Sequence, residues 1–327
     1  MTPLDLCLDQ LSKTQPLLRL QEGQPLDKWR ALARQKLREL LGMDMIVPCA
    51  LDVQIEETLD KGDYTRTRFT FGSEPGFRVP GYFCRPVGGD ASKVMICLQG
   101  HSSGMHISLG ETKYPGDEID VKGGDRDFAK QAIAHGHAAL VIEQRCFGEQ
   151  GGNEDGGTNC GRASMVALLL GRTTLAGRVW DVMRAIDVTE AHFSPGAQYH
   201  CMGNSGGGTA TWYAAALEPR MAKAMPSCAV CSYDGSIAPI SHCICNYVPG
   251  IRRWFDMGDL AGLIAPRPLV VVAGAQDRIF PIDATRETFA LIQQYYKAAG
   301  APESCKLYVG GEGHRFYAEA WEEFVAL

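Results

Sequence analysis

The chain has 327 residues, enough for one large α/β domain with an appendage or for two smaller domains. Hydrophobic residues at 45% and charged residues at 21% are ordinary globular proportions, and a net charge of −6 argues against a nucleic-acid-binding groove. No lysine/arginine run suggests contact with a membrane surface, and the apolar stretches are too short to span a bilayer. The N-terminus lacks a signal-peptide pattern, so we expect a cytoplasmic protein.

The first part of the chain predicts a helix followed by antiparallel strands. Residues 24–42 carry apolar side chains near helical spacing, with Lys and Arg between them and a terminal glycine. Alternating segments at 51–57, 65–71 and 78–85 are typical of strands near a sheet edge. We expect residues 1–45 to form a helical extension, which packs on the main domain or against a second subunit. Whether the chain forms a homo-oligomer is left open.

From residue 93 onward, strand-like and helix-like segments alternate. The run 94–98 is continuously apolar, as expected of a strand covered on both faces. Further strands are expected at 138–143, 198–202, 221–225, 269–273 and 306–309, and helices at 126–135, 175–192, 209–217, 283–299 and 316–324. This alternation predicts an α/β domain over 46–327, with a doubly wound, mostly parallel sheet of about eight strands and helices on both faces. Two long insertions, at about 144–163 and 227–259, are expected to be functional.

A Gly-x-Ser-x-Gly motif lies between an expected strand and an expected helix. In Gly203-Asn204-Ser205-Gly206-Gly207, the strand–turn–helix context is the one in which such a serine becomes an exposed nucleophile. Glycines two residues before and after the serine prevent collisions within the sharp turn. The alternative is a glycine-rich turn with no chemical role, so the interpretation depends on an acid and a histidine elsewhere.

Both partners follow later strands of the predicted sheet. Asp277 comes directly after strand 269–273, and His314 comes after strand 306–309. Catalytic groups of open α/β sheets gather at these carboxyl ends, and the order Ser, Asp, His is that of α/β-hydrolases. We predict a triad in which His314 takes the proton of Ser205 and Asp277 orients the histidine. Taken alone, Asp277 could instead cap a turn and His314 could be a surface residue.

The oxyanion hole needs two N–H donors. One is expected from Gly206, the residue after the nucleophile, and the other from His101 in the loop after strand 94–98. His101 paired with His106 as a metal site is the disfavoured alternative, because no carboxylate accompanies them in their loop.

The twelve cysteines do not predict a metal site. Most stand singly in apolar segments, where cysteine behaves as a small hydrophobe. Cys228 and Cys231 have C-x-x-C spacing, and Cys243 lies two residues before Cys245, but no second pair follows at zinc-finger distance. We therefore expect reduced thiols and no metal or organic cofactor.

The motifs around the triad resemble a known family. Gly-Asn-Ser-Gly-Gly-Gly, Gly-Gln-Asp-x-Ile-Phe-Pro around Asp277 and Gly-x-Gly-His-Arg-Phe-Tyr around His314 look like the acetyl xylan esterase-like and dienelactone hydrolase-like α/β-hydrolases. The segment 143–149 is similar to the Asp-x-Arg-Gly-x-Gly-x-Ser segment of acetyl xylan and cephalosporin C esterases. Gly206 departs from the pattern, since those esterases usually carry Gln there, and their His-Gly-Tyr oxyanion loop is Gln-Gly-His at 99–101. Dienelactone hydrolases proper use a cysteine nucleophile.

The resemblance implies an α/β-hydrolase fold and a serine carboxylic-ester hydrolase that forms an acyl-enzyme. The expected partner is a small ester of carbohydrate type. The alternatives are a prolyl-oligopeptidase-like peptidase and a hydrolase-fold binding protein. Candidate pocket residues lie near the active face or in the second insertion: Gln99, Arg145, His242 and Trp254. For Arg145 an ion pair that braces its loop is the favoured alternative, and for Trp254 a core position.

Overall fold

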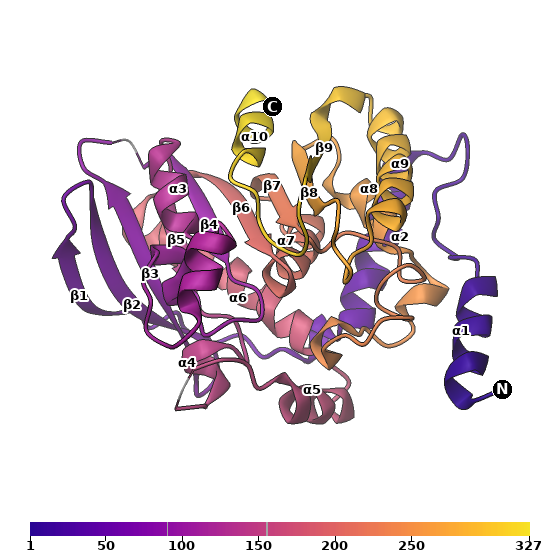
Figure 1. The fold of residues 1–327 in the computed structure, drawn as a ribbon, viewed down its shortest axis with the longest axis horizontal. Coiled ribbons are helices and arrows are strands. Elements are labelled where there is room, and N and C mark those ends of the chain that lie inside the picture. The colour runs from indigo at the N-terminus through magenta and orange to yellow at the C-terminus, as the bar shows by residue number, and fades with distance from the viewer. Residues whose placement is uncertain (90, 155) are drawn as a thin grey trace.

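In the computed structural model, a central sheet of nine strands carries helices on both faces (Figure 1). The structure describes residues 1–89, 91–154 and 156–327, so Asp155 in the first expected insertion lies outside the described part. The α/β architecture predicted from the sequence is confirmed, with nine strands in place of about eight.

The sheet has an antiparallel edge and a parallel remainder. Its strands in chain order are β1 (Gln54–Asp60), β2 (Tyr64–Glu74), β3 (Phe77–Pro86), β4 (Lys93–Leu98), β5 (Ala138–Ile142), β6 (Gln198–Asn204), β7 (Met221–Ser227), β8 (Leu269–Gly274) and β9 (Cys305–Gly310). Their spatial order is β1-β2-β3-β5-β4-β6-β7-β8-β9. β1, β2 and β3 pair antiparallel, β3 joins β5 antiparallel, and all pairs from β5 to β9 are parallel.

The parallel strands are apolar throughout because each face of the sheet has its own core. In β4, Val94 and Ile96 belong to the larger core cluster, whereas Met95 and Cys97 belong to a second cluster on the opposite face. Successive side chains of a strand point to opposite faces, so both faces need apolar residues.

The helices divide between these two faces. The larger core takes in α2 (Leu26–Leu41), α6 (Thr174–Val188), α7 (Gly206–Leu217), α8 (Ala261–Ile264) and α9 (Ile282–Ala298). The second core takes in α3 (Phe128–Ala134) and α10 (Ala320–Ala326). Trp29 of α2 is fully buried and packs against Tyr295 of α9, with the two rings tilted and their centroids 5.2 Å apart, so the predicted N-terminal helix packs on the domain. This contact leaves the oligomeric state open.

Among the described residues, four α-helices were not predicted, one of which is α8, just after the second insertion. α1 (Pro3–Lys13) begins at a capping box formed by Thr2 and Asp5 and has no buried residue. α4 (Gly148–Gly151) lies within the first insertion, and α5 (Cys160–Leu169) begins near its end. Across the described residues, no helix combines the length and the apolar character that crossing a membrane would require.

Two buried histidines lie at the amino ends of β5 and β6. His137 and His200 are 5% and 4% exposed and pack against Phe324 of α10. His137 Nδ1 contacts the carbonyl oxygen of His135 at 3.0 Å, and its Nε2 lies 2.9 Å from His200 Nδ1. With both rings neutral and His137 Nδ1 donating to the carbonyl, His137 Nε2 accepts from His200 Nδ1. Burial lowers the pKa of His137 to about 4 and that of His200 to about 3.

The pair should make the fold sensitive to acid. Below pH 6.5 the unfolded chain binds protons that the folded pair does not, so each histidine lowers the free energy of unfolding by about 1.4 kcal/mol per pH unit. His200→Asn keeps a donor toward His137 and removes one titrating ring. In urea denaturation, the stability lost between pH 7 and pH 5 should be about 2 kcal/mol smaller in the variant. An equal loss in both proteins would contradict this explanation.

Candidate active site

The turn between β6 and α7 holds Ser205 in a strained conformation. Its backbone has φ 55° and ψ −122°, in a region that residues with a Cβ rarely occupy. Backbone strain of this kind is concentrated at functional sites. Ser205 is partly exposed, whereas Asn204 and Gly206 on either side of it are buried. The turn therefore presents this one side chain at the carboxyl edge of the sheet, at the start of α7.

Glycines 203 and 207 make this turn sterically feasible. A Cβ on Gly203 would lie 2.6 Å from the carbonyl carbon of Gly207. A Cβ on Gly207 would lie 2.0 Å from the carbonyl oxygen of Leu98, in the neighbouring strand β4. No side chain can be accommodated at such distances from backbone atoms, so both positions require glycine.

Asp277 and His314 follow the adjacent strands β8 and β9 and are hydrogen-bonded to each other. His314 Nδ1 lies 2.8 Å from Asp277 Oδ2. The other carboxylate oxygen accepts the N–H groups of Ile279 at 2.8 Å and Phe280 at 3.0 Å. Burial acts to raise the pKa of Asp277, but the hydrogen bond and charge of His314, with the two amides, outweigh it and hold that pKa below its usual value. The ionised carboxylate thus orients His314 with Nε2 directed away from it.

The end of β7 links the serine turn to the loop of His314. The N–H of Ser205 donates to the carbonyl oxygen of Ser227 at 2.9 Å. The next residue, Cys228, donates its thiol to the carbonyl of Arg315 at 3.1 Å. Cys228 Sγ also lies within 4.8 Å of ligand atoms of both Asp277 and His314. Within the described residues no hydrogen bond joins Ser205 to His314.

The loop after β4 approaches the serine closely. A Cβ on Gly100 would lie 2.9 Å from the Cβ of Ser205. Across the three described ranges, no protein acceptor takes the backbone N–H of His101 or of Gly206. Both N–H groups therefore remain available beside the serine, where the sequence analysis expected the oxyanion donors.

A buried carboxyl group accepts hydrogen bonds from backbone N–H groups next to this loop. Glu143, 1% exposed, accepts the N–H groups of Met105 and Glu149, each at 3.2 Å. Burial raises the pKa of Glu143 to about 8. His106 lies nearby but contacts Asp117 at 2.8 Å, so it does not share a site with His101.

Comparisons with known proteins bear on this arrangement. No protein-family model matches the chain. The inferred hydrolase YtaP of Bacillus subtilis (strain 168) is 22% identical over 245 residues, which are 72% of this chain and 78% of that protein. An inferred acetyl xylan esterase of Bacteroides fragilis NCTC 9343 superposes with a TM-score of 0.79 at 15% identity, over 95% of this chain and 82% of that one. A glucuronoyl esterase from Solibacter usitatus gives 0.68 at 16% identity, over 96% and 98%. The fold is that of the α/β-hydrolases.

Of the four candidate pocket residues, His242 is linked to His314 by aromatic contacts through Phe280. Its ring packs edge-on against Phe280 at 5.3 Å, and Phe280 in turn stacks on His314 at 5.9 Å. Its Nε2 contacts Ser236 Oγ at 3.1 Å. The second insertion thus reaches the candidate active site through two aromatic contacts that the sequence did not reveal.

The other three candidates contact protein groups, although the Oε1 atom of Gln99 has no hydrogen-bond partner among the described residues. Gln99 is 2% exposed and donates to Ser108 and to the carbonyl of Arg126. The Trp254 ring faces Lys36 of α2, with the ammonium 4.2 Å from the ring centroid.

Arg145 lies in a buried ion-pair network. It forms two hydrogen bonds of 2.7 Å to Asp181 and also contacts Glu74. These ion pairs connect the start of the first insertion to β2 and α6.

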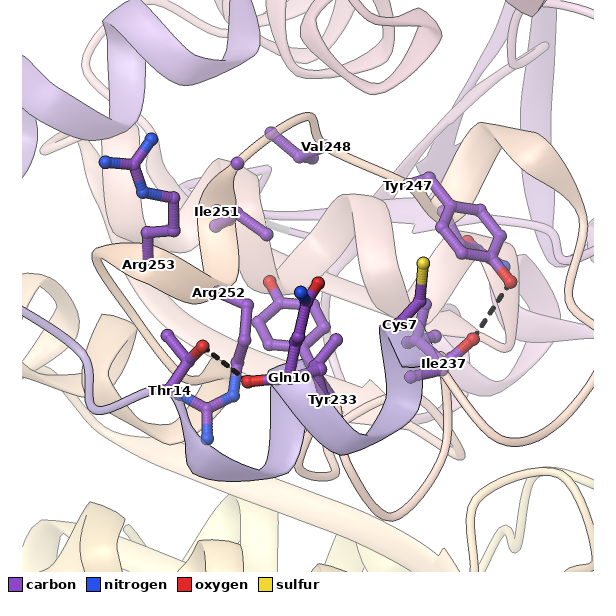
Figure 2. A pocket seen from close by; sticks show the side chains of 14 residues that line it. Cys7, Gln10, Thr14, Tyr233, Ile237, Tyr247, Val248, Ile251, Arg252 and Arg253 are labelled. Atoms are coloured by element: carbon purple, nitrogen blue, oxygen red, sulfur yellow. Dashed lines mark hydrogen bonds between the residues drawn. The ribbon is translucent and has the colours of Figure 1, made fainter. Parts of the chain in front are cut away.

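A separate cavity of about 410 Å³ lies between α1 and the second insertion (Figure 2). Cys7 and Gln10 of α1 form one wall, and Tyr233, Tyr247 and Ile251 of the insertion contribute to the other. Neither Ser205 nor His314 lines it, so this cavity is distinct from the candidate active site.

The Arg145 network predicts a stability effect. Asp181→Asn should lower the free energy of unfolding by about 3 kcal/mol, because it leaves a buried guanidinium without its main counter-charge. Asp187→Asn, on the same helix but half-exposed, is the control and should cost under about 1 kcal/mol. Urea denaturation measures both. Unchanged stability of the Asp181 variant together with a raised KM for esters would instead assign Arg145 to substrate binding.

Proposed function

We propose that the protein is a serine hydrolase of carboxylic esters. The observation that carries this proposal is the bonded pair of Asp277 and His314, 2.8 Å apart, at the same sheet edge as the strained turn of Ser205. An imidazole held by a carboxylate beside an exposed serine is the arrangement that activates a hydroxyl group for attack. The two free N–H groups of His101 and Gly206 supply the complementary oxyanion donors.

The reaction proceeds in two halves. Ser205 Oγ attacks the ester carbonyl carbon while its proton passes to Nε2 of His314, and the carbonyl oxygen becomes an oxyanion near the two N–H groups. Collapse of this intermediate breaks the C–O bond, and His314 protonates the departing alkoxide. Water then attacks the acyl-enzyme with His314 again as base, which releases the acid and restores Ser205. Asp277 stays ionised and stabilises the imidazolium in both halves.

The substrate class that we propose is a small ester of carbohydrate type, with deacetylation favoured. Support comes from the names of the structurally similar proteins, which include acetyl xylan and glucuronoyl esterases. A panel of acetylated sugars, uronic-acid esters, lactones and peptide amides distinguishes the alternatives. Preference for peptide amides over all esters would favour a peptidase.

Replacement of the nucleophile tests the activity itself. Ser205→Ala should lower the turnover of p-nitrophenyl acetate by about 10⁶, since the attacking oxygen is lost. The variant should also lose covalent labelling by a fluorophosphonate probe. Ser164→Ala, which removes a buried hydroxyl bonded to Thr174 at 2.7 Å, is the matched control and should retain both. Unchanged turnover of a folded Ser205 variant would reject the assignment, and a wild-type chain that fails to label would favour a binding protein.

Asp277 should act through the histidine. Asp277→Asn leaves a group of similar shape but favours the wrong imidazole tautomer, so kcat should fall by about 10⁴ with KM little changed. Steady-state kinetics on the same ester measures the split between kcat and KM. A rise in KM at constant kcat would mean that Asp277 binds substrate instead.

A further inference from the structure

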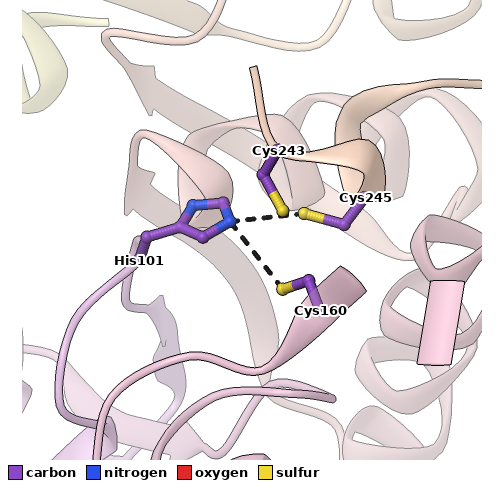
Figure 3. Close-up of side chains that lie close together, drawn as sticks. All are labelled: His101, Cys160, Cys243 and Cys245. Atoms are coloured by element: carbon purple, nitrogen blue, oxygen red, sulfur yellow. Dashed lines mark hydrogen bonds between the residues drawn. The ribbon is translucent and has the colours of Figure 1, made fainter. Parts of the chain in front are cut away.

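Four side chains with metal-binding atoms converge beside the oxyanion loop. They come from that loop, from the first turn of α5 and from the second insertion, and their ligand atoms all lie within 4.8 Å of one another: His101, Cys160, Cys243 and Cys245 (Figure 3). His101 Nε2 is 3.3 Å from Cys245 Sγ and 3.8 Å from Cys160 Sγ. The three cysteines of this cluster, and the adjacent Cys146, are free of disulfide bonds.

These separations match those around a tetrahedral zinc ion. With Zn–N about 2.1 Å and Zn–S about 2.3 Å, tetrahedral angles put a ligand nitrogen about 3.6 Å from each sulfur. The two measured distances from His101 Nε2 bracket this value. One histidine with three cysteines is a standard donor set for structural zinc.

The charge of a neighbouring arginine is the second, independent observation. Arg178 is 1% exposed, and its guanidinium contacts Cys245 Sγ at 3.3 Å and Cys160 Sγ at 3.4 Å. Its other acceptor is the carbonyl oxygen of Arg145, and within the described residues no carboxylate forms an ion pair with it. A buried cation needs a counter-charge. Three thiolates around a divalent cation carry one net negative charge, which the guanidinium balances.

We propose that His101, Cys160, Cys243 and Cys245 bind one zinc ion at a closed structural site. On binding, the three thiols release their protons to solvent, three Zn–S bonds form, and the fourth bond comes from neutral His101 Nε2. Because the protein fills all four positions, the ion has no open position for a substrate. The ion joins the oxyanion loop to Cys160 of the first insertion and to Cys243 and Cys245 of the second. These three segments are far apart in the sequence.

Zinc ligation also determines which ring nitrogen of His101 carries the proton. Ligation through Nε2 leaves the ring proton on Nδ1, and this nitrogen lies 3.0 Å from where a Cβ on Gly206 would be. The metal thus holds the loop that carries one of the two oxyanion donors. This consequence for catalysis rests on the proposed function, whereas the metal site itself does not.

Metal content of the intact chain tests the site directly. The purified protein, incubated with ZnCl₂ under reducing conditions and passed through a desalting column, should retain about one zinc per chain by elemental mass spectrometry. Replacement by Co²⁺ should give the strong visible absorption of a tetrahedral thiolate complex. Retention of no metal would overturn the proposal. So would a disulfide bond between any two of the three cysteines that mass spectrometry still detects after incubation under reducing conditions.

Variants assign the ligands. Cys160→Ser and Cys245→Ser should each reduce the retained zinc severalfold and lower the melting temperature by several degrees in the presence of zinc. Cys305→Ser, a buried cysteine in β9, is the matched control and should retain the full amount. Full zinc retention by either ligand variant would contradict the assignment. If a variant fails to fold, the Co²⁺ spectrum of the wild-type chain still decides.

The outcomes separate this proposal from the proposed function. Ser205→Ala should keep its zinc, since the serine is not a ligand. A chain that binds zinc but does not label with fluorophosphonate would reject only the hydrolase. A chain that labels but retains no zinc would reject only the metal site.

Discussion

The left-handed backbone of Ser205 is the constraint on which the rest of the site depends. An L residue is stable at φ 55° only if the surrounding structure holds it there. Here β6 lies in the middle of the sheet and α7 is buried along its whole length, so neither end of the turn can relax. The same constraint excludes side chains at Gly203 and Gly207 and brings the Gly100 loop against the serine. The N–H groups of Gly206 and His101, which we propose as oxyanion donors, therefore lie beside this turn.

Much of the fold was predictable because the parallel strands are buried on both faces. Runs such as 94–98 and 269–273 are continuously apolar for that reason, and Asp277 and His314 each come directly after such a run. Their convergence follows from topology alone, since β8 and β9 are adjacent and parallel. The helix α1 was not predicted, although Leu4, Leu8 and Leu11 recur at helical spacing, and it has no buried residue.

The cysteine cluster could not be predicted by the same reasoning. Spacing rules for metal sites apply to ligands within one local unit, but His101 lies 59 residues from Cys160 and 144 from Cys245. Only Cys243 and Cys245 are close in sequence. The three segments that bring the ligands together are loops and a helix start, and their relative positions depend on tertiary packing around Phe147 and Arg178.

Arg145 and Arg178 are neighbours, but their guanidinium groups have different partners. Arg145 satisfies its buried charge with the carboxylates of Asp181 and Glu74. Arg178, which donates to the Arg145 carbonyl, directs its remaining N–H groups at sulfur instead. Nothing in the sequence around either residue distinguishes them. The difference arises because α6 carries Arg178 toward the cysteines of both insertions, and with reduced, protonated thiols alone this cation would lack a counter-charge.

The departures from the esterase pattern at positions 101 and 206 are best understood as one change. A side chain at 206, such as the Gln common in the esterases that the chain resembles, would begin 3.0 Å from His101 Nδ1 and 3.2 Å from the Phe147 ring. Glycine at 206 leaves that space to the imidazole, whose ring packs on Phe147 at 4.7 Å and turns Nε2 toward the three cysteines. The loop that carries the proposed oxyanion donor is then held by a side chain of its own, which contacts a cysteine of each insertion.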